Sequence, residues 1–369
     1  MLILPQPPLR QPRTWRQKIK SYICAALIGV CLASCSSTSG PIASRDEQAQ
    51  LDRFIRDINN NLGQIWGFQE IMFKPTDLVK YSDKWNTRAV IHFETGQIRF
   101  ETLSDDYYTA LKNEIIFTLL MNQEPEDGTL YDATTPQVSR GTPFLANQVV
   151  DNNGKPITTV AQADAYASSI LNTQIKVRRL SNGQLAYYVD IYMIKNHLSA
   201  RAKQYAPLVY KYANQYKVDP RLMFAIMEIE SAFNPYAKSS SGAIGLMQIV
   251  PRTAGTDVYK YLGYSGQPSQ KYLYNPENNI QAAAIYINIM MTQYFSKIEN
   301  PTNLRYVLIA SYNGGPGGLL SIFNSNRAKA VDIINGMSPG QVYSYVTSKH
   351  YSAETRRYLM KVSQAYRKY

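Results

Sequence analysis

The spacing of apolar positions changes near residue 196. Before this point, apolar residues occur in short runs, such as residues 90–93 and 97–100, which flank the turn Glu94-Thr95-Gly96. Two such runs around a short turn with glycine are typical of a β-hairpin. After residue 196, apolar residues recur at the spacing of helix faces. The pattern predicts the α+β fold class, with a small mixed α/β N-terminal domain followed by an all-α domain.

The two predicted domains cover residues 41–196 and 197–369. In the first we also expect two helices, two more hairpin turns and one long strand, at residues 48–63, 108–121, 151–154, 181–183 and 185–194. In the second we expect helices at residues 201–216, 219–231, 245–250, 278–294, 304–312 and 353–366. The first domain contains no constellation of residues that indicates chemistry.

One carboxyl group lies on an apolar helix face in the second domain. Asp219 is a suitable N-cap for the helix at 219–231, and proline follows it at the first helical position. Glu230 lies four residues after Ile226 and seven after Met223, so it projects from an apolar face. Desolvation there would raise the pKa of Glu230, as a general acid requires.

Two alternatives apply to this helix. Glu228 lies two residues before Glu230, about 200° around the helix, so it cannot share the same apolar surroundings and we expect it to be solvated or paired. Glu230 itself could be a structural carboxylate that caps a neighbouring helix. The helix alone does not decide between a structural and a catalytic Glu230.

Four short motifs follow one another along the second domain. They are Glu-Ser at 230–231, Gly-Leu-Met-Gln at 245–248, Ser-Tyr-Asn-Gly-Gly at 311–315 and Glu-Thr-Arg-Arg-Tyr at 354–358. In this order they resemble the motifs of soluble and membrane-bound lytic murein transglycosylases, which have a lysozyme-like fold. The resemblance covers roughly residues 200–369. The third motif departs at its first and fourth positions, where many relatives have alanine.

The amino-terminal half carries a resemblance of its own. Residues 61–68, Asn-Leu-Gly-Gln-Ile-Trp-Gly-Phe, are similar to the corresponding segment of the membrane-bound lytic transglycosylase C family. This family belongs to the Slt type of transglycosylases, so the two resemblances agree. They imply that the all-α domain is a lysozyme-like catalytic domain.

The resemblance implies roles for individual residues. Glu230 matches the catalytic acid that later acts as base, and Ser231 matches the residue that touches the N-acetyl group near the cleaved bond. Tyr358 matches the tyrosine whose hydroxyl approaches the catalytic glutamate.

The second and third motifs imply contacts with the sugar substrate. Met247 and Gln248 match residues that line the sugar subsites, and Tyr312 and Asn313 match residues that shape the pocket around the acid. For Met247 and Tyr312, core packing is an equally good interpretation, since methionine and tyrosine at helical spacing often belong to the core.

Only eight acidic residues follow residue 196, and Glu228 is the one within ten residues of Glu230. Most glycosidases use two carboxyl groups. A distant acid could still fold next to Glu230. In the family, the acetamido group of the substrate assists bond cleavage, and the muramic C6 hydroxyl then attacks the anomeric carbon. The product carries a 1,6-anhydromuramic end.

The first 34 residues indicate export. They contain five basic residues and no acidic one, followed by a short apolar run at residues 22–33. The run is shorter than the roughly 20 residues that span a bilayer, so it is typical of a secretory signal peptide. The run ends in Leu32-Ala33-Ser34-Cys35, which resembles a bacterial lipobox.

A lipobox implies that cleavage leaves Cys35 as a lipid-bearing N-terminus, with palmitate among its acyl chains, followed by a polar tether over residues 35–40. The alternative is an ordinary signal peptide with an incidental cysteine. Serine rather than aspartate follows Cys35, which in enteric-type bacteria favours the outer membrane, with the body of the protein in the periplasm.

Cysteine and histidine positions exclude several site types. All three cysteines lie at or before residue 35, so we expect no internal disulfide in the mature chain. His92, His197 and His350 match no zinc-ligand spacing, and the sequence contains no calcium-loop or phosphate-loop pattern. We therefore predict no metal and no cofactor.

Charge divides the chain in the same way as the apolar pattern. Residues 35–196 carry 15 basic and 19 acidic groups, a net charge of −4, whereas residues 197–369 carry 19 and 8, a net charge of +11. A basic domain favours an anionic partner. Export argues against nucleic acid, so peptidoglycan, with carboxylates on its stem peptides, is the better candidate. A surplus of solvated lysine explains part of the charge in either case.

These observations predict a monomeric, lipid-anchored lyase that acts on carbon–oxygen bonds of peptidoglycan during cell wall turnover and remodelling. The bonds are the β-1,4 links between N-acetylmuramic acid and N-acetylglucosamine. A lysozyme-type muramidase that uses water is the nearest alternative. An alternative of another class is a non-catalytic peptidoglycan-binding lipoprotein.

Overall fold

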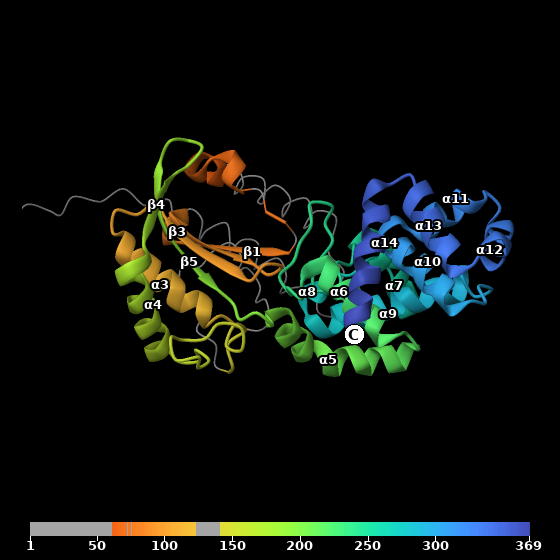
Figure 1. Ribbon diagram of the computed structural model, residues 1–369, viewed down its shortest axis with the longest axis horizontal. Helices are drawn as coiled ribbons and strands as arrows, with labels where there is room; N and C mark the ends of the chain where they lie inside the picture. Colours follow the sequence, from red (N-terminus) through yellow and green to blue (C-terminus); the bar gives the residue numbers. More distant parts are fainter. Residues whose placement is uncertain (1–60, 72, 75, 123–140) are drawn as a thin grey trace, which may run out of the picture. The chain divides into compact units, whose positions relative to one another are not determined.

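The computed structural model describes residues 61–71, 73–74, 76–122 and 141–369 (Figure 1). The predicted signal peptide, Cys35, the tether and most of the predicted helix at 48–63 lie outside the described residues; residues 61–66 are helical. Within the described part of the chain, no helix combines the length and the apolar character that a bilayer span needs.

The N-terminal part is built on a five-stranded antiparallel sheet with the order β1-β2-β3-β5-β4. Its helices α3 and α4 lie side by side along one face of the sheet (Figure 1). The bounds are β1 Asp77–Ser82, β2 Thr87–His92, β3 Gln97–Thr102, α3 Tyr107–Leu119, α4 Val160–Gln174, β4 Lys176–Arg179 and β5 Leu185–Tyr192.

Two of the three predicted hairpins are confirmed. His92 pairs with Gln97 across the first turn, and β4 pairs with β5 around the turn at 181–183. The predicted hairpin at 151–154 is wrong in extent, because only a single bridge between Val150 and Pro156 forms there. The segment after this turn enters α4 within a few residues, so no second strand can follow it.

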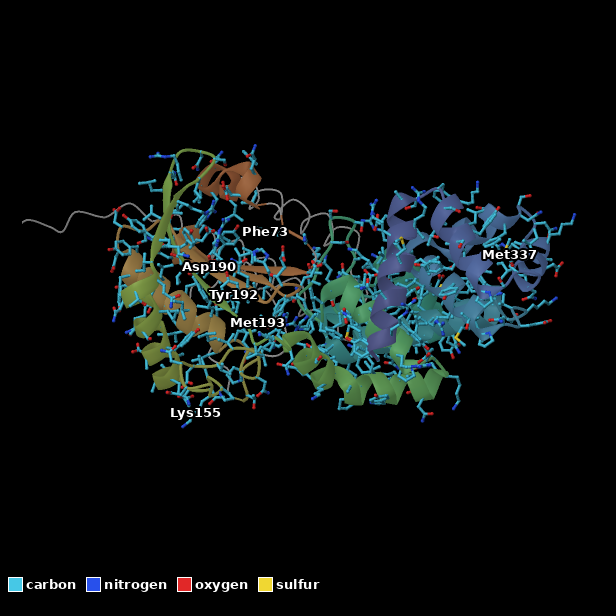
Figure 2. The ribbon with its side chains drawn as sticks, in the orientation of Figure 1. Phe73, Lys155, Asp190, Tyr192, Met193 and Met337 are labelled. Atoms are coloured by element: carbon cyan, nitrogen blue, oxygen red, sulfur yellow. The ribbon has the colours of Figure 1, made fainter. Side chains whose placement is uncertain are left out.

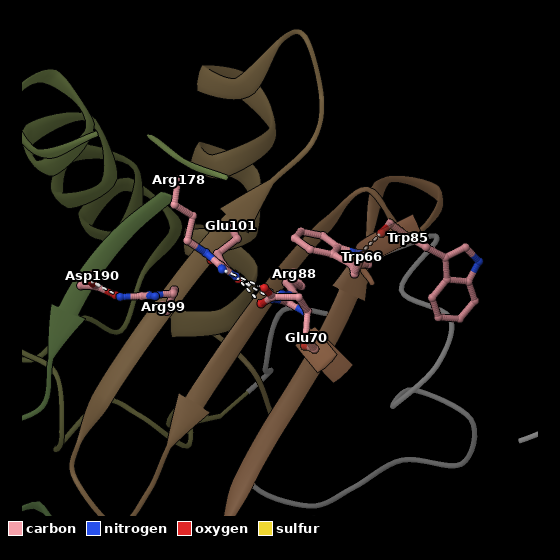
Figure 3. A network of polar contacts seen from close by, with 8 residues as sticks. All are labelled: Trp66, Glu70, Trp85, Arg88, Arg99, Glu101, Arg178 and Asp190. Carbon is pink, nitrogen blue, oxygen red and sulfur yellow. Dashed lines mark hydrogen bonds and ion pairs between the residues drawn. The ribbon is translucent and has the colours of Figure 1, made fainter. Parts of the chain in front are cut away.

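Buried and half-buried charges link three strands of the sheet with the short helix η1, Phe68–Ile71. Figure 3 shows the side chains converging: Arg88 on β2 and Arg178 on β4 both bind Glu101 on β3, at 2.6 Å each. Arg178 also binds Glu70 at 2.8 Å, and Arg88 lies 4.0 Å above the ring of Trp66. Only the Arg88–Glu101 pair is fully buried, and removing one partner of such a pair typically costs about 3 to 5 kcal/mol because the other charge is left buried and unpaired.

The C-terminal part consists of helices, which confirms the predicted fold class. Asp219 caps α6 as predicted, since its side chain accepts a hydrogen bond from the backbone N–H of Arg221 at 2.9 Å. The bounds are α5 His197–Tyr216, α6 Pro220–Ser231, α7 Thr256–Tyr261, α8 Gln270–Tyr274, α9 Pro276–Ile289, α10 Pro301–Gly314, α11 Pro316–Phe323, α12 Arg327–Asn335, α13 Pro339–Lys349 and α14 Ala353–Ala365.

The predicted helix at 245–250 is wrong. Residues 241–250 form turns and isolated bridges. Gly245 and Gln248 have positive φ angles of 76° and 48°, which a right-handed helix cannot contain. A Cβ atom on Gly245 would lie 2.6 Å from the carbonyl oxygen of Leu273, so glycine is required there for space as well.

A fully buried arginine joins the start of α5 to both halves of the chain. Met193 follows β5, where the chain passes to α5 (Figure 2), and its sulfur lies 3.3 Å from Nη1 of Arg201. Arg201 donates to the carbonyl oxygen of Phe93 at 2.6 Å and to Oε1 of Gln148 at 2.5 Å. Its Nε donates to the carbonyl oxygen of Ala232 at 3.0 Å, just after α6. Burial lowers the pKa of Arg201 to about 9.

The segment that follows α6, residues 232–236, also contacts the part of the chain that contains the sheet. Ala232 and Phe233 both have left-handed backbone angles, with φ of 50° and 60°. The buried amide of Asn234 donates to the carbonyl oxygen of Asp77 at 3.3 Å, and the hydroxyl of Tyr236 donates to the carbonyl oxygen of Asn122 at 2.8 Å. Each left-handed residue other than glycine costs about 1 to 2 kcal/mol. Contacts from the N-terminal half therefore hold a strained backbone next to Glu230.

Candidate active site

Glu230 lies in the last turn of α6, on a face that is apolar except for one polar contact. The hydroxyl of Tyr358, on α14, donates to Oε1 of Glu230 at 2.7 Å. Burial is the main cause that raises the pKa of Glu230 to about 7; the hydrogen bond from Tyr358 opposes this shift, and the nearby charge of Glu354 adds to it. At neutral pH the carboxyl group therefore has comparable populations of its acid and base forms.

Two phenols stand next to this carboxyl group, that of the buried Tyr358 and that of the half-buried Tyr312. Burial, together with the charge of Glu230, holds the pKa values of Tyr312 and Tyr358 well above their usual range. Both therefore remain protonated donors at any physiological pH. Tyr312 donates to the carbonyl oxygen of Met247 at 2.7 Å, and its ring meets that of Tyr286 edge-on at 5.8 Å between centroids. The phenols fix the geometry around Glu230 without exchanging protons themselves.

A distant acid does fold near Glu230, the possibility that the sequence left open. Glu354, at the start of α14, is exposed and raises the pKa of Glu230 by charge repulsion. Asn313 holds it in place, since the amide Nδ2 of Asn313 donates to Oε1 of Glu354 at 3.1 Å. The hydroxyl of Thr355 donates to Oδ1 of the same asparagine at 2.7 Å. Glu354 belongs to the fourth motif, but 124 residues of sequence separate it from Glu230.

The second motif forms a turn against the end of α6. The hydroxyl of Ser231, which is fully buried, lies 2.7 Å from the carbonyl oxygen of Leu246. Met247 is also fully buried, and the amide of Gln248 donates to the carbonyl oxygens of Ala237 and Gly245. In this structure Ser231 and Met247 are buried and belong to the packing of the turn. The sugar contacts predicted for the motif stay predictions.

One residue of this turn's support gave no sequence signal of its own. Asn279, on α9, is fully buried, and its Nδ2 donates to the carbonyl oxygens of Ile244 and Leu273 at 2.8 Å each. Its Oδ1 accepts from the backbone N–H of Met247 at 2.8 Å. A buried asparagine that uses all these groups fixes the turn beside Glu230. In the sequence Asn279 is one of several polar residues around Ile280, so no local pattern singles it out.

The structure describes the contacts of the two residues at which the third motif departs from many relatives, Ser311 and Gly314. Gly314 faces the start of α14, where a Cβ atom would lie 2.9 Å from the hydroxyl oxygen of Thr355. Ser311 is fully buried, and among the described residues its hydroxyl has no hydrogen-bond partner. Glycine thus permits the close approach of α10 and α14, while the structure gives no reason for serine in place of alanine.

Glu228 points away from Glu230, as the helical geometry predicts. It forms an ion pair with Lys368 and accepts a hydrogen bond from the hydroxyl of Tyr369 at 2.8 Å. The two acids of α6 therefore have separate surroundings, one paired and one poised to exchange a proton.

Of the predicted site residues, the structure brings Glu230, Ser231, Met247, Tyr312 and Tyr358 into one connected group. Asn313 joins it through Glu354, and Gln248 through the turn. Among the described residues, no group of three or more histidine, cysteine or acidic side chains could hold a metal ion. The arrangement can donate a proton to a leaving oxygen and later remove one from a hydroxyl.

Comparison with known proteins gives this site a context. Residues 44–204 match the family model described as "Membrane-bound lytic murein transglycosylase C, N-terminal domain", and residues 207–335 match that of the "Transglycosylase SLT domain". The second match ends before the fourth motif, which holds Glu354 and Tyr358.

Similar proteins extend the match to nearly the full chain. The membrane-bound lytic murein transglycosylase C of Actinobacillus pleuropneumoniae serotype 5b is 42% identical over 364 residues, covering 96% of this chain and 99% of the relative. The protein of the same name from Photorhabdus laumondii is 43% identical, covering 95% and 99%. Among solved structures, the complex of the 70-kDa soluble lytic transglycosylase with bulgecin A is 28% identical, with a TM-score of 0.35, covering 47% of this chain and 25% of that one.

Identity above 40% over nearly the whole length of both chains, together with both domain models, leaves one assignment. The chain belongs to the family of membrane-bound lytic murein transglycosylase C.

Proposed function

We propose that this protein is a lytic transglycosylase that cleaves the β-1,4 bond between N-acetylmuramic acid and N-acetylglucosamine in peptidoglycan, without water. The observation that carries this proposal is the carboxyl group of Glu230, which a buried phenol orients and whose pKa burial raises to about 7. Family membership supplies the substrate class, since the relatives are named as murein transglycosylases.

The proposed reaction uses Glu230 twice. In its protonated form, Glu230 donates its proton to the glycosidic oxygen as the bond to the muramic anomeric carbon breaks. The acetamido group of the substrate stabilises the electron-poor carbon, and Glu230, now ionised, accepts the proton of the muramic C6 hydroxyl as that oxygen attacks the same carbon. A pKa near 7 suits both roles, because neither proton transfer is then strongly uphill.

Tyr358 and Glu354 balance the proton affinity of Glu230 in opposite directions. The phenol stabilises the ionised form, and the nearby carboxylate of Glu354 destabilises it. Glu354 is also the residue that a lysozyme-type hydrolase would need as its second carboxyl group. Asn313 holds the carboxylate of Glu354 by a hydrogen bond, and the side chain is exposed. We therefore assign it an electrostatic role instead of a nucleophilic one.

The products distinguish the transglycosylase from the muramidase. We expect muropeptides released from purified sacculi to carry 1,6-anhydromuramic ends, which are one water lighter than reducing ends. Mass spectrometry of the soluble products measures this difference directly. A majority of reducing ends would instead show that water attacks, and binding without any release would support the non-catalytic alternative.

The pH profile tests the two neighbours of Glu230. Because Glu230 must be protonated in the first step, kcat/KM should fall on the alkaline side as its pKa, near 7, is passed. Tyr358→Phe removes a bond to the ionised form, so the pKa and the alkaline limb should rise. Glu354→Gln removes a negative charge, so both should fall. Limbs that moved in the same direction, or not at all, would contradict these assignments.

We also propose that Cys35 anchors the chain in the outer membrane, with the catalytic part in the periplasm. The lipobox-like residues 32–35 and the membrane-bound relatives support this anchor. Acyl chains survive a high-salt wash, whereas the attraction of a basic domain to anionic surfaces is screened. We expect Cys35→Ala with an ordinary cleavable signal to move the protein from the washed membranes to the soluble periplasm. Retention of this variant on the washed membranes would argue against the anchor.

A further inference from the structure

A half-open groove of about 650 Å³ lies at the far end of the helices that carry Glu230 and Tyr358. It is lined by residues of α6, α10, α13 and α14 and by the residues that follow α14. Most of the lining residues are arginine or tyrosine: Arg221, Arg305, Tyr306, Tyr343, Tyr366, Arg367 and Tyr369. Its volume is within the range of small-molecule sites.

The groove is separate from the site of bond cleavage. Arg221 precedes Glu230 by nine residues on α6, which corresponds to about 14 Å along the axis and about half a turn around it. Arg221 and Glu230 therefore project from opposite sides of the helix. The groove cannot be a subsite for the sugars on either side of the cleaved bond.

Three guanidinium groups line this groove, and only that of Arg221 has an ion pair with a carboxylate among the described residues. The guanidinium carbons of Arg305 and Arg221 lie 4.4 Å and 4.8 Å from the ring centre of the same tyrosine, Tyr366. Asp219 compensates Arg221 through a contact of 3.4 Å and also accepts the hydroxyl of Tyr366. Arg305 and Arg367 have no ion pair with any carboxylate that the structure describes. Like charges held near one ring repel each other unless an anion joins them.

The half-buried position of Arg305 strengthens this argument. Water and salt screen the charge of an exposed arginine, but Arg305 is half-buried beside Tyr306 and Tyr366. Its guanidinium carbon lies 5.5 Å and 4.4 Å from the centres of these two rings, and its N–H groups donate to no other side chain or carbonyl among the described residues. The hydroxyl of Ser363, which also lines the groove, is buried and has no hydrogen-bond partner among the described residues. The groove thus offers unused donors and uncompensated positive charge together.

We propose that this groove binds a carboxylate of a peptidoglycan stem peptide, on a part of the wall other than the bond being cleaved. An arginine fork matches the geometry of a carboxylate, and tyrosine rings can pack against the aliphatic parts of a short peptide. The choice of ligand rests on the proposed function, because stem peptides are the source of carboxylates in that substrate. A stem peptide bound in this groove, away from the bond being cleaved, would keep the enzyme on the wall between cleavage events.

Binding can be measured without cleavage. We would use the full chain with Cys35→Ala, to avoid acylation, and Glu230→Gln, to prevent turnover. The probe is N-acetyl-L-alanyl-γ-D-glutamyl-meso-diaminopimelate, titrated by calorimetry, and the comparison probe is the same peptide with its carboxylates converted to carboxamides. We expect the carboxylate peptide to bind and the carboxamide peptide to bind at least about tenfold more weakly, since charged hydrogen bonds are lost.

The matched variants are Arg305→Gln and Arg327→Gln. Arg327 also stacks on a tyrosine, with its guanidinium carbon 5.6 Å from the ring centre of Tyr294, but it does not line the groove. We expect Arg305→Gln to weaken peptide binding at least about tenfold and Arg327→Gln to leave it unchanged. Arg367→Gln, at an exposed position, provides a second test if Arg305→Gln does not fold.

Several results would overturn the proposal. Equal binding by wild-type and Arg305→Gln chains, or by the two peptides, would show that the groove takes no carboxylate. Binding of phosphatidylglycerol vesicles or inorganic phosphate that depends on Arg305, without peptide binding, would assign the groove to phosphate groups. Neither result concerns the products of cleavage, so a failure here is distinguishable from a failure of the transglycosylase assignment.

Discussion

Replacing Glu230 with glutamine should lower the release of muropeptides from sacculi by at least about a hundredfold. Glutamine cannot donate a proton to the glycosidic oxygen or accept one from the C6 hydroxyl, and general acid–base catalysis contributes about 10² to 10⁴ in rate. Its amide oxygen can still accept the hydrogen bond that Tyr358 donates to Glu230 at 2.7 Å. The variant should therefore fold and bind glycan strands. Release is measured as soluble muropeptides per unit time from purified sacculi.

The matched control is Glu228→Gln on the same helix. Glu228 bonds to Lys368 and Tyr369 instead of the phenols around Glu230, so its loss should leave the rate within a few fold of wild type. If Glu228→Gln were as inactive as Glu230→Gln, the chemistry would not depend on the orientation of Glu230. If Glu230→Gln kept more than about a tenth of the activity, Glu354 would be the next acid to test.

Glu230→Gln should also change how the free energy of unfolding depends on pH. The folded-state pKa of Glu230 is raised from 4.5 to about 7, so between these values the folded state binds more protons than the unfolded state. Its carboxyl group therefore reduces the stability increasingly as the pH rises through this window, by an amount on the order of 1 to 3 kcal/mol above pH 7. Glu230→Gln should remove this penalty and raise the melting temperature at pH 8 more than at pH 4.5.

Local chemistry made the framework of the fold predictable. Asp219 and Pro220 define the start of α6 through a cap and a fixed φ angle, which depend on neighbouring residues alone. The hairpin between His92 and Gln97 follows from the turn between two short apolar runs. The prediction of a helix at 245–250 was wrong, because Asn279 on α9 bonds to this segment and holds it in a turn. Apolar periodicity alone suggests a helix there.

The site was predictable as a set of residues more than as an arrangement. The motifs contain Glu230 and Tyr358, and the structure joins them across 128 residues by one hydrogen bond. The position of Glu354 depends on Asn313 and on the packing of α10 against α14, and no local pattern carries this information. The contacts of Arg201 are also invisible in the sequence, because its partners lie up to 108 residues away.

Arg201 is the subject of the last prediction, because it connects the N-terminal half to the backbone next to Glu230. Its Nε holds the carbonyl oxygen of Ala232, two residues after Glu230, while its other nitrogens bind Phe93 and Gln148. Arg201→Met would leave these acceptors buried and unsatisfied, at a cost of roughly 2 to 4 kcal/mol. It would also remove the hydrogen bond from Arg201 to Ala232, whose backbone has a left-handed conformation. We expect kcat/KM to fall by about 10- to 100-fold at temperatures where the variant remains folded, since small displacements of catalytic groups have effects of this size.

The control separates positioning from stability. Arg88 is as deeply buried as Arg201, but it binds Glu101 and stacks on Trp66 within the N-terminal half. Arg88→Met should lower the melting temperature as much as Arg201→Met while leaving kcat/KM and the pH profile unchanged below the transition. Arg201→Met should in addition shift the alkaline limb, because the surroundings of Glu230 change. A pH profile that neither substitution moves would mean that the N-terminal half only stabilises the protein. A shift confined to Arg201→Met would show that this half positions the catalytic carboxyl group.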